Sequence, residues 1–175
     1  IEDVSVKEGR TGTLAFVKVR HTVGDARGPA IVEEQDIVYR AMPQPGETPP
    51  EPKPAPTGEQ FSRTVVPDPV LLFRFSALTF NGHRIHYDRP YATAEEGYAG
   101  LVVHGPLIAT LLLDLLRRHA PQAELATFRF KALRPTFDGR PMRVSGSPQA
   151  DGKTVHLWAQ DHEGWLTMDA TAVLR

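Results

Sequence analysis

Cysteine is absent from the 175-residue chain, and its absence excludes several classes of site. Without cysteine there is no disulfide framework, no thiolate ligand for a metal and no thiol nucleophile. A chain without cysteine is typical of a reducing compartment, and no secretory signal is recognisable where the sequence starts. We therefore expect a cytoplasmic protein.

Strong charge of one sign is also missing. The formal net charge is −1 and there is no run of Lys or Arg, so we expect no nucleic-acid partner. The longest apolar run, residues 101–116, is shorter than the ~20 residues that span a bilayer, and it contains His104 and Asp114. We expect no membrane segment, and we interpret this run as a buried part of a globular domain.

Proline, in contrast, is concentrated in one place. Residues 42–58 (MPQPGETPPEPKPAPTG) favour extended conformations and cannot form a helix or a central strand. We expect a linker at residues 44–60, which separates partial N-terminal strands at residues 1–43 from a main domain at residues 61–175. A simple spacer is favoured over a ligand for a proline-binding domain.

The region before the linker has the pattern of a β-hairpin. Residues 12–23 and 30–41 are rich in β-forming side chains, and GDARG between them predicts a turn. A hairpin cannot bury a core alone, so we expect it to pack against the second half of the chain or against a segment that precedes Ile1.

The region after the linker predicts a helix followed by strands. Pro106 suits a first helical position, leucines follow at helical spacing, and Arg117, Arg118 and His119 complement the helix dipole. This helix is apolar nearly all round, so we expect it to be buried. Strands are predicted at residues 126–135, 142–149, 154–161 and 165–174. The order indicates an α+β fold, with an antiparallel sheet wrapped around one helix.

Three segments between the linker and the helix are harder to assign. Residues 65–75 read as an extended lead-in because two prolines interrupt them, and residues 76–80 as a short helix or turn. Residues 89–100 (RPYATAEEGYAG) read as a loop.

The nine residues 80–88 (FNGHRIHYD) hold the densest group of reactive side chains. His83, His86, Asp88 and the later His104 are ligand types that a metal accepts. Their spacing is not that of an HExxH helix, and no other carboxylate has a recognisable spacing, so we expect no metal. The sequence also lacks the G-x-S-x-G elbow of serine hydrolases.

Residues 73–92 (FRFSALTFNGHRIHYDRPYA) and 96–112 (EGYAGLVVHGPLIATLL) resemble the C-terminal half of the MaoC-type hotdog acyl-thioester hydratases. The similarity is to the branch that contains the type 2 hydroxyacyl-thioester dehydratases and the mesaconyl- and itaconyl-CoA hydratases. The earlier strands and the Pro-rich segment resemble the end of that branch's first repeat. The resemblance implies a double hotdog whose first repeat is incomplete in this chain.

The resemblance also implies catalytic residues. The wider family carries a Ser-Gly-Asp-x-Asn-Pro-x-His motif, and alignment on its last residue places His86 on the catalytic histidine and Asn81 on the usual aspartate. His86 can carry protons near neutral pH, whereas Asn81 can only hold a water through its carbonyl oxygen. Gly105 lies at the start of the buried helix, where a free N–H and the dipole favour the developing charge of a thioester oxygen.

Further residues are candidates for substrate binding: His83, Arg84, His104 and Arg74. An arginine near the site would suit a substrate carboxylate or a CoA phosphate. Each has a structural alternative; for Arg84 this is an ion pair with Asp88 or Glu95.

The expected activity is that of a hydro-lyase on an enoyl- or 3-hydroxyacyl-CoA thioester, and the resemblance favours a short C5 dicarboxylic substrate such as itaconyl- or mesaconyl-CoA. CoA is then part of the substrate and no cofactor is expected. Three alternatives stay open: a 3-hydroxyacyl-thioester dehydratase of fatty acid metabolism, a hotdog thioesterase and a non-catalytic acyl-CoA-binding module. Because hotdog sheets commonly pair edge to edge, we also expect a homodimer.

Overall fold

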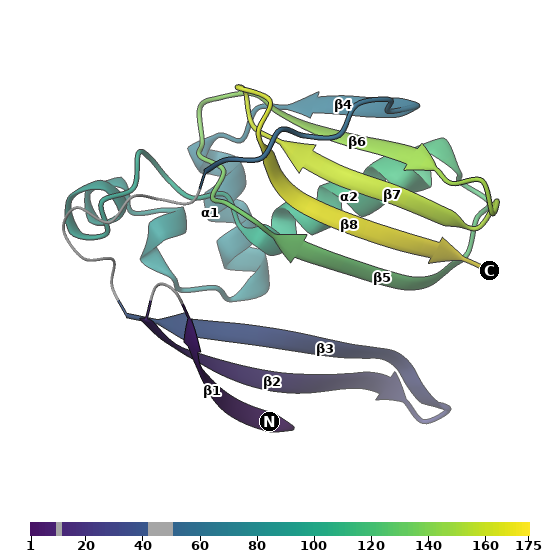
Figure 1. Ribbon diagram of the computed structural model, residues 1–175, viewed down its shortest axis with the longest axis horizontal. Coiled ribbons are helices and arrows are strands. Elements are labelled where there is room, and N and C mark those ends of the chain that lie inside the picture. Colours follow the sequence, from purple (N-terminus) through teal and green to yellow (C-terminus); the bar gives the residue numbers. More distant parts are fainter. Residues whose placement is uncertain (10–11, 42–50) are drawn as a thin grey trace. The chain divides into compact units, whose positions relative to one another are not determined.

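The computed structural model describes residues 1–9, 12–41 and 51–175 (Figure 1). The chain divides into two compact units, Ile1–Pro50 and Glu51–Arg175. Each unit has its own sheet, and the buried apolar core belongs to the second unit.

The first unit is an antiparallel sheet of three strands in the order β1-β2-β3: β1 (Asp3–Gly9), β2 (Gly12–Asp25) and β3 (Gly28–Arg40). The predicted hairpin is confirmed as β2 and β3. Its turn is held by Asp25, whose Oδ1 accepts the backbone N–H of Arg27 at 2.8 Å, and by Gly28, whose φ of 117° suits glycine. Strand β1 was not expected, although Val4 and Val6 alternate with polar residues there.

Residues 44–50 of the predicted linker lie outside the described residues, and residues 51–60 form neither a helix nor a strand. Residues 51–60 are hydrogen-bonded to the C-terminal part of the chain: the N–H of Ala55 donates to the carbonyl of Gly164 at 2.9 Å, and the N–H of Leu166 donates to the carbonyl of Lys53 at 2.8 Å. Figure 1 shows this stretch crossing the face of the sheet opposite α2. These residues therefore form part of the second unit.

The second unit is an antiparallel sheet of five strands around one long helix. The strand order is β4-β6-β7-β8-β5, and helix α2 (Gly105–His119) contacts β4, β6, β7 and β8 (Figure 1). The strands are β4 (Phe61–Val65), β5 (Leu125–Ala132), β6 (Met142–Pro148), β7 (Thr154–Gln160) and β8 (Leu166–Leu174). This is the α+β hotdog fold that the sequence predicted.

Helix α2 follows directly from its sequence. It begins at Gly105, carries Pro106 in its first turn and ends in a basic turn at His119, as predicted. Its buried face consists of apolar side chains at helical spacing: Leu107, Ile108, Ala109, Leu112, Leu115 and Leu116. Each fully buried leucine contributes about 1.5–3 kcal/mol relative to exposure, so this face fixes the helix in the sheet.

The segment before the motif differs from its prediction. Residues 69–79 form a helix, α1 (Pro69–Thr79), where an extended lead-in was expected up to residue 75 and a short helix or turn at residues 76–80. Pro69 lies in the first turn, which needs no N–H from it, and Asp68 caps the helix by accepting the N–H of Leu71 at 2.7 Å. The helix ends at Phe80 in the left-handed conformation, with φ of 53°. The prolines thus start a helix rather than prevent one.

The expected loop at residues 89–100 is also partly helical. It contains one turn of π-helix, Tyr91–Glu95, and the motif before it contains a 3₁₀ helix, Arg84–His86. Asp88 contacts both turns, because its Oδ1 accepts the N–H of Tyr91 at 3.2 Å and its own N–H donates to the carbonyl of Arg84 at 2.8 Å.

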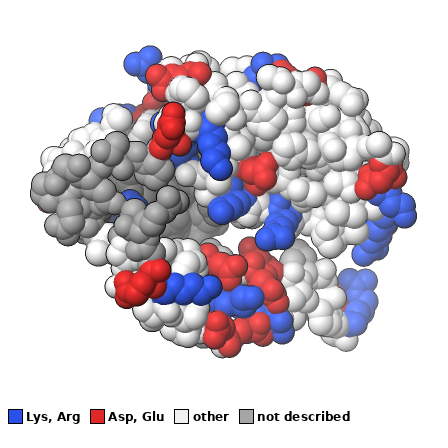
Figure 2. Space-filling model, in the orientation of Figure 1, with Lys and Arg blue, Asp and Glu red and all other residues white. Residues whose placement is uncertain are grey.

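The described surface carries charges of both signs. Figure 2 shows Lys and Arg side chains interleaved with Asp and Glu over one face, consistent with the net charge of −1. None of the helices in residues 1–9, 12–41 and 51–175 combines the length and the apolar character needed to cross a membrane.

Candidate active site

His86 is a buried histidine with one fixed ring nitrogen. It ends the 3₁₀ helix, is 8% exposed, and its Nδ1 lies 2.7 Å from the carbonyl oxygen of Val102. A carbonyl can only accept, so Nδ1 carries the proton and Nε2 of the neutral ring is free to accept one. Burial lowers the pKa of His86, against the opposing effect of the Val102 hydrogen bond. His86 is therefore neutral near pH 7.

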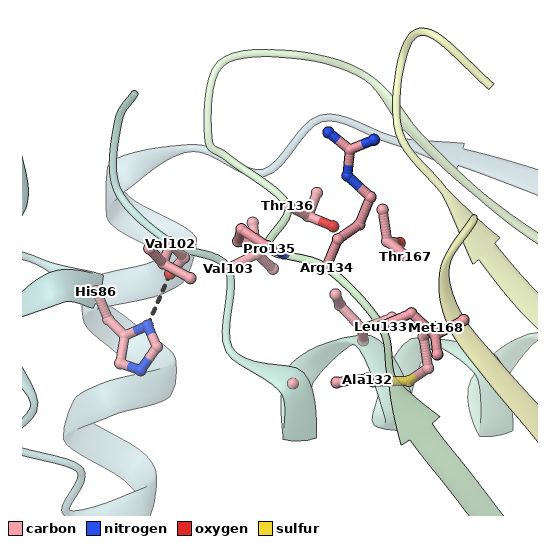
Figure 3. A pocket seen from close by; sticks show the side chains of 12 residues that line it. His86, Val102, Val103, Ala132, Leu133, Arg134, Pro135, Thr136, Thr167 and Met168 are labelled. Atoms are coloured by element: carbon pink, nitrogen blue, oxygen red, sulfur yellow. Dashed lines mark hydrogen bonds between the residues drawn. The ribbon is translucent and has the colours of Figure 1, made fainter. Parts of the chain in front are cut away.

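A cavity of about 320 Å³ brings His86 and Gly105 together. His86 enters from the 3₁₀ helix and Gly105 from the start of α2, and Met168 of β8 closes another side (Figure 3). The N–H of Gly105 is in the first helical turn and has no acceptor within the helix. A Cβ atom at Gly105 would meet nothing nearer than the Met168 methyl at 4.0 Å, so the glycine leaves open space beside its amide.

His104 packs against one face of the His86 ring. Its ring is fully buried and stacks on the His86 ring, with centroids 3.7 Å apart and planes at 17°. Its Nε2 is joined to Ser76 Oγ of α1 by a hydrogen bond of 2.8 Å. Burial and the neighbouring His86 lower the pKa of His104 to about 4, so it is neutral at pH 7. His104 thus positions His86 rather than lining the cavity.

Asn81 lies away from this cavity. Its Oδ1 accepts the backbone N–H of His83 at 3.0 Å, and its own N–H donates to the carbonyl of Ser76 at 2.9 Å. Asn81 instead borders a second, apolar hollow of about 260 Å³ between Phe73, Phe80 and other residues of that surface. Asn81 is not among the residues that line the His86 cavity, and its role as a water holder stays a prediction.

The arginines chosen from the sequence also lie outside the cavity. Arg84 binds Asp88 Oδ2 through Nε at 3.0 Å and Nη2 at 2.7 Å, and its guanidinium lies 4.1 Å from the centre of the Tyr91 ring. Arg84 lowers the pKa of Asp88 through this ion pair. Arg74 is exposed on α1, and it does not line the cavity.

His83 is exposed, and its ring meets that of His86 edge-on at 5.5 Å. It lies beside the site without lining the cavity. Among the sequence-predicted residues, His86 and Gly105 line the cavity. His104 does not line it but packs against His86.

Several cavity residues were not predicted. Arg134, Pro135 and Thr136 follow β5, and Thr167 and Met168 belong to β8. They meet because the pairing of β5 with β8 places the end of one beside the start of the other, and Leu133 donates to the carbonyl of Thr167 at 2.9 Å. The sequence holds no local signal for this contact, because it depends on strand pairing across more than 30 positions.

The second unit is a hotdog domain, and solved structures of hydratases and dehydratases share this fold. The (R)-hydratase from A. caviae involved in PHA biosynthesis has a TM-score of 0.59 and 20% identity, covering 67% of this chain and 94% of that one. A MaoC-like dehydratase from Phytophthora capsici has a TM-score of 0.71 and 18% identity, covering 98% and 60%. At this identity they show the fold alone.

The sequence profile of hydroxyacyl-thioester dehydratase type 2 matches residues 1–138, and the chain belongs to this family. The mesaconyl-C(4)-CoA hydratase of Chloroflexus aurantiacus is 49% identical over 177 residues, which cover 99% of this chain and 61% of that protein. The mitochondrial hydroxyacyl-thioester dehydratase type 2 of Schizosaccharomyces pombe is 40% identical over 101 residues, covering 57% and 32%. The chain thus spans about three fifths of the first relative and about one third of the second.

Proposed function

We propose that this chain carries the active site of a hydro-lyase that adds water to an enoyl-CoA thioester or removes it from a 3-hydroxyacyl-CoA thioester. One observation carries the proposal: a cavity lined both by a neutral histidine with a free Nε2 and by a glycine at a helix N-terminus. Membership of the dehydratase family supports the same chemistry.

In the hydration direction, the thioester oxygen accepts the N–H of Gly105. The helix dipole and this amide stabilise the negative charge that develops on that oxygen. His86 Nε2 takes a proton from a water as its oxygen attacks C3, and the resulting imidazolium returns a proton to C2. One water is consumed: its hydroxyl forms the new bond at C3, and the proton that His86 removed from it forms the new C–H bond at C2. Dehydration is the reverse.

The neighbours of His86 hold it for this task. The carbonyl of Val102 fixes the tautomer that leaves Nε2 free, and the His104 ring supports the imidazole from one face. We assign Asn81 a positioning role, because it binds the N–H of His83 at the start of the turn that carries His86. Acid–base work then falls on His86 alone.

For the acyl group we propose a short C5 dicarboxylic chain, as in mesaconyl- or itaconyl-CoA. The relative from Chloroflexus aurantiacus, a mesaconyl-C(4)-CoA hydratase, supports this choice. A dehydratase of fatty acid metabolism is the second candidate, supported by the Schizosaccharomyces pombe relative. In either case CoA is part of the substrate, and the mechanism uses no cofactor.

We also propose a homodimer, formed through the edge strand β5. Within the described residues β5 pairs only with β8; Leu125 and Phe130 on it, and Leu133 directly after it, are about 40% exposed. An apolar edge strand is a template for pairing with another strand. Light scattering should give twice the mass of the 19.4 kDa chain.

Turnover of three thioesters tests the proposed activity. Purified protein is mixed with mesaconyl-CoA, itaconyl-CoA or crotonyl-CoA, and both enoyl-thioester absorbance and free thiol are followed. The proposal predicts loss of absorbance without release of free CoA. Release of thiol would support a thioesterase instead, and binding without any turnover would support an acyl-CoA-binding module.

A further inference from the structure

Two polar atoms at one end of the cavity are buried without a partner. Arg134 Nη1 and Thr136 Oγ1 have no hydrogen bond to any described residue, and Thr136 as a whole is 3% exposed. A buried polar atom that is left unpaired costs about 1–3 kcal/mol, so such atoms are rare in native proteins unless a ligand uses them. Both residues line the cavity that contains His86.

The backbone holds this pair firmly. The carbonyl of Thr136 accepts the N–H of Val103 at 2.8 Å, two positions before Gly105, and the N–H of Arg134 lies 3.4 Å from the carbonyl of Thr167. In Figure 3, His86 lies on one side of the drawn residues and Arg134 on the other, with Val103 and Thr136 between them.

The Arg134 side chain has unused hydrogen-bonding capacity. Its charged neighbour is Asp161, whose Oδ2 lies 3.9 Å from Nη1, beyond hydrogen-bond distance. The other carboxylate oxygen of Asp161 already accepts the N–H groups of Glu163 and Trp165. A guanidinium has five N–H donors, so Arg134 can still bind a second carboxylate in a bidentate manner.

We propose that Arg134 and Thr136 form an anion subsite that binds the carboxylate of a dicarboxylic acyl group. The inference rests on the proposed function and assigns the acyl-group specificity to residues other than Arg74 and Arg84. An aliphatic acyl chain would leave both buried polar atoms unpaired, and sites built in this way discriminate strongly against a ligand without the matching group.

An anion at Arg134 could come from the acyl carboxylate or from a CoA phosphate. The acyl carboxylate is favoured, because Thr136 is buried and lines the same cavity as His86 and Gly105, where the acyl group reacts. The chain offers a matched control in Arg140, an exposed residue before β6 that does not line the cavity.

Calorimetric binding of saturated thioesters tests the subsite separately from turnover. Succinyl-CoA and butyryl-CoA have the same four-carbon chain, and only the first carries a carboxylate. We expect the wild type to prefer succinyl-CoA and Arg134→Gln to weaken that ligand roughly tenfold to hundredfold, the effect of a hydrogen bond between charged groups, with butyryl-CoA little changed. Thr136→Val should act in the same direction with a smaller effect, and Arg140→Gln should change neither affinity.

Three results would overturn the subsite: equal wild-type affinity for the two thioesters, an unchanged preference in Arg134→Gln, or an equal loss for both thioesters. An equal loss that disappears with butyryl-pantetheine, which lacks the nucleotide, would place a CoA phosphate at Arg134. A preference for succinyl-CoA that depends on Arg134, in a protein that hydrates no enoyl thioester, would support the subsite and contradict the proposed activity.

Discussion

At the scale of single residues, the two stacked histidines have different tasks because their surroundings differ. His86 reaches the cavity with one nitrogen and binds a carbonyl with the other. His104 is fully enclosed and bound to Ser76, and its low pKa keeps it uncharged beside His86. A second positive charge at this point would oppose protonation of His86 during catalysis.

The pKa of His104 predicts how stability depends on pH. The ordinary histidine pKa is 6.5, and in the folded protein that of His104 is about 4. As the pH falls, the unfolded chain therefore takes up this proton before the folded protein does. The contribution of His104 to the free energy of unfolding is complete above pH 6.5 and falls by about 3 kcal/mol between pH 6.5 and pH 4. Urea unfolding of wild type and His104→Gln measures this.

The free energy of unfolding should fall more steeply with acidification in the wild type than in His104→Gln, since other groups titrate equally in both. Parallel pH profiles for the two proteins would contradict a buried neutral His104.

Gly105 allows stability and activity to be separated. Its φ is not in the left-handed region, and a Cβ would meet only Met168 at 4.0 Å, so Gly105→Ala should fold and even gain a few tenths of a kcal/mol in helix stability. The added methyl group should crowd the amide where the thioester oxygen binds and lower kcat/KM at least tenfold. Thermal unfolding and steady-state kinetics measure the two effects.

Gly82→Ala is the matched control for that substitution, because a Cβ there meets nothing within 4 Å and Gly82 does not line the His86 cavity. Full activity in Gly105→Ala would contradict the proposed contact between this amide and the thioester.

At the scale of elements, α1 matters because it supplies Ser76 to His104. Its start depends on Asp68, which accepts the N–H of Leu71. Asp68→Ala should lower the free energy of unfolding by about 1 kcal/mol, whereas Asp68→Asn should be nearly neutral, since asparagine caps helices as well as aspartate. Chemical denaturation of the three proteins measures this, and an equal loss in both variants would show that capping is not the cause.

The elements differ in how well the sequence alone predicts them. Helix α2 and strands β5 to β8 were predictable, because their apolar periodicity is sustained and their ends carry turn residues. The first part of helix α1 was not predicted, because Pro67 and Pro69 indicate an interrupted extended segment when read alone. A proline in the first turn after a capping aspartate instead starts a helix.

Part of the candidate site could also be predicted from the sequence. The placement of His86 and Gly105 in one cavity followed from the motif and the helix start. The bond from Ser76 to His104 and the position of Arg134 depend on packing between distant segments, and Asn81 is occupied by a local turn contact that its residue type alone does not reveal.

At the scale of the whole molecule, the hotdog unit explains why the site lies where it does. The sheet wraps α2 and leaves its N-terminus facing the segment after β5, so the amide of Gly105, the ring of His86 and the end of the sheet enclose one cavity. The sheet of residues 1–40 forms a separate unit, and the family match covers both.

The central claim is that His86 drives addition of water to C3 of an intact thioester. The most direct measurement is mass spectrometry of the products formed from mesaconyl-CoA in water labelled with heavy oxygen, by wild type and by His86→Ala. The account predicts one labelled hydroxyl on the acyl chain of an intact CoA thioester in the wild type, and a rate reduced by about 10²-fold or more in a folded His86→Ala protein. Label in a free carboxylate with released CoA, or undiminished labelling by His86→Ala, would contradict it.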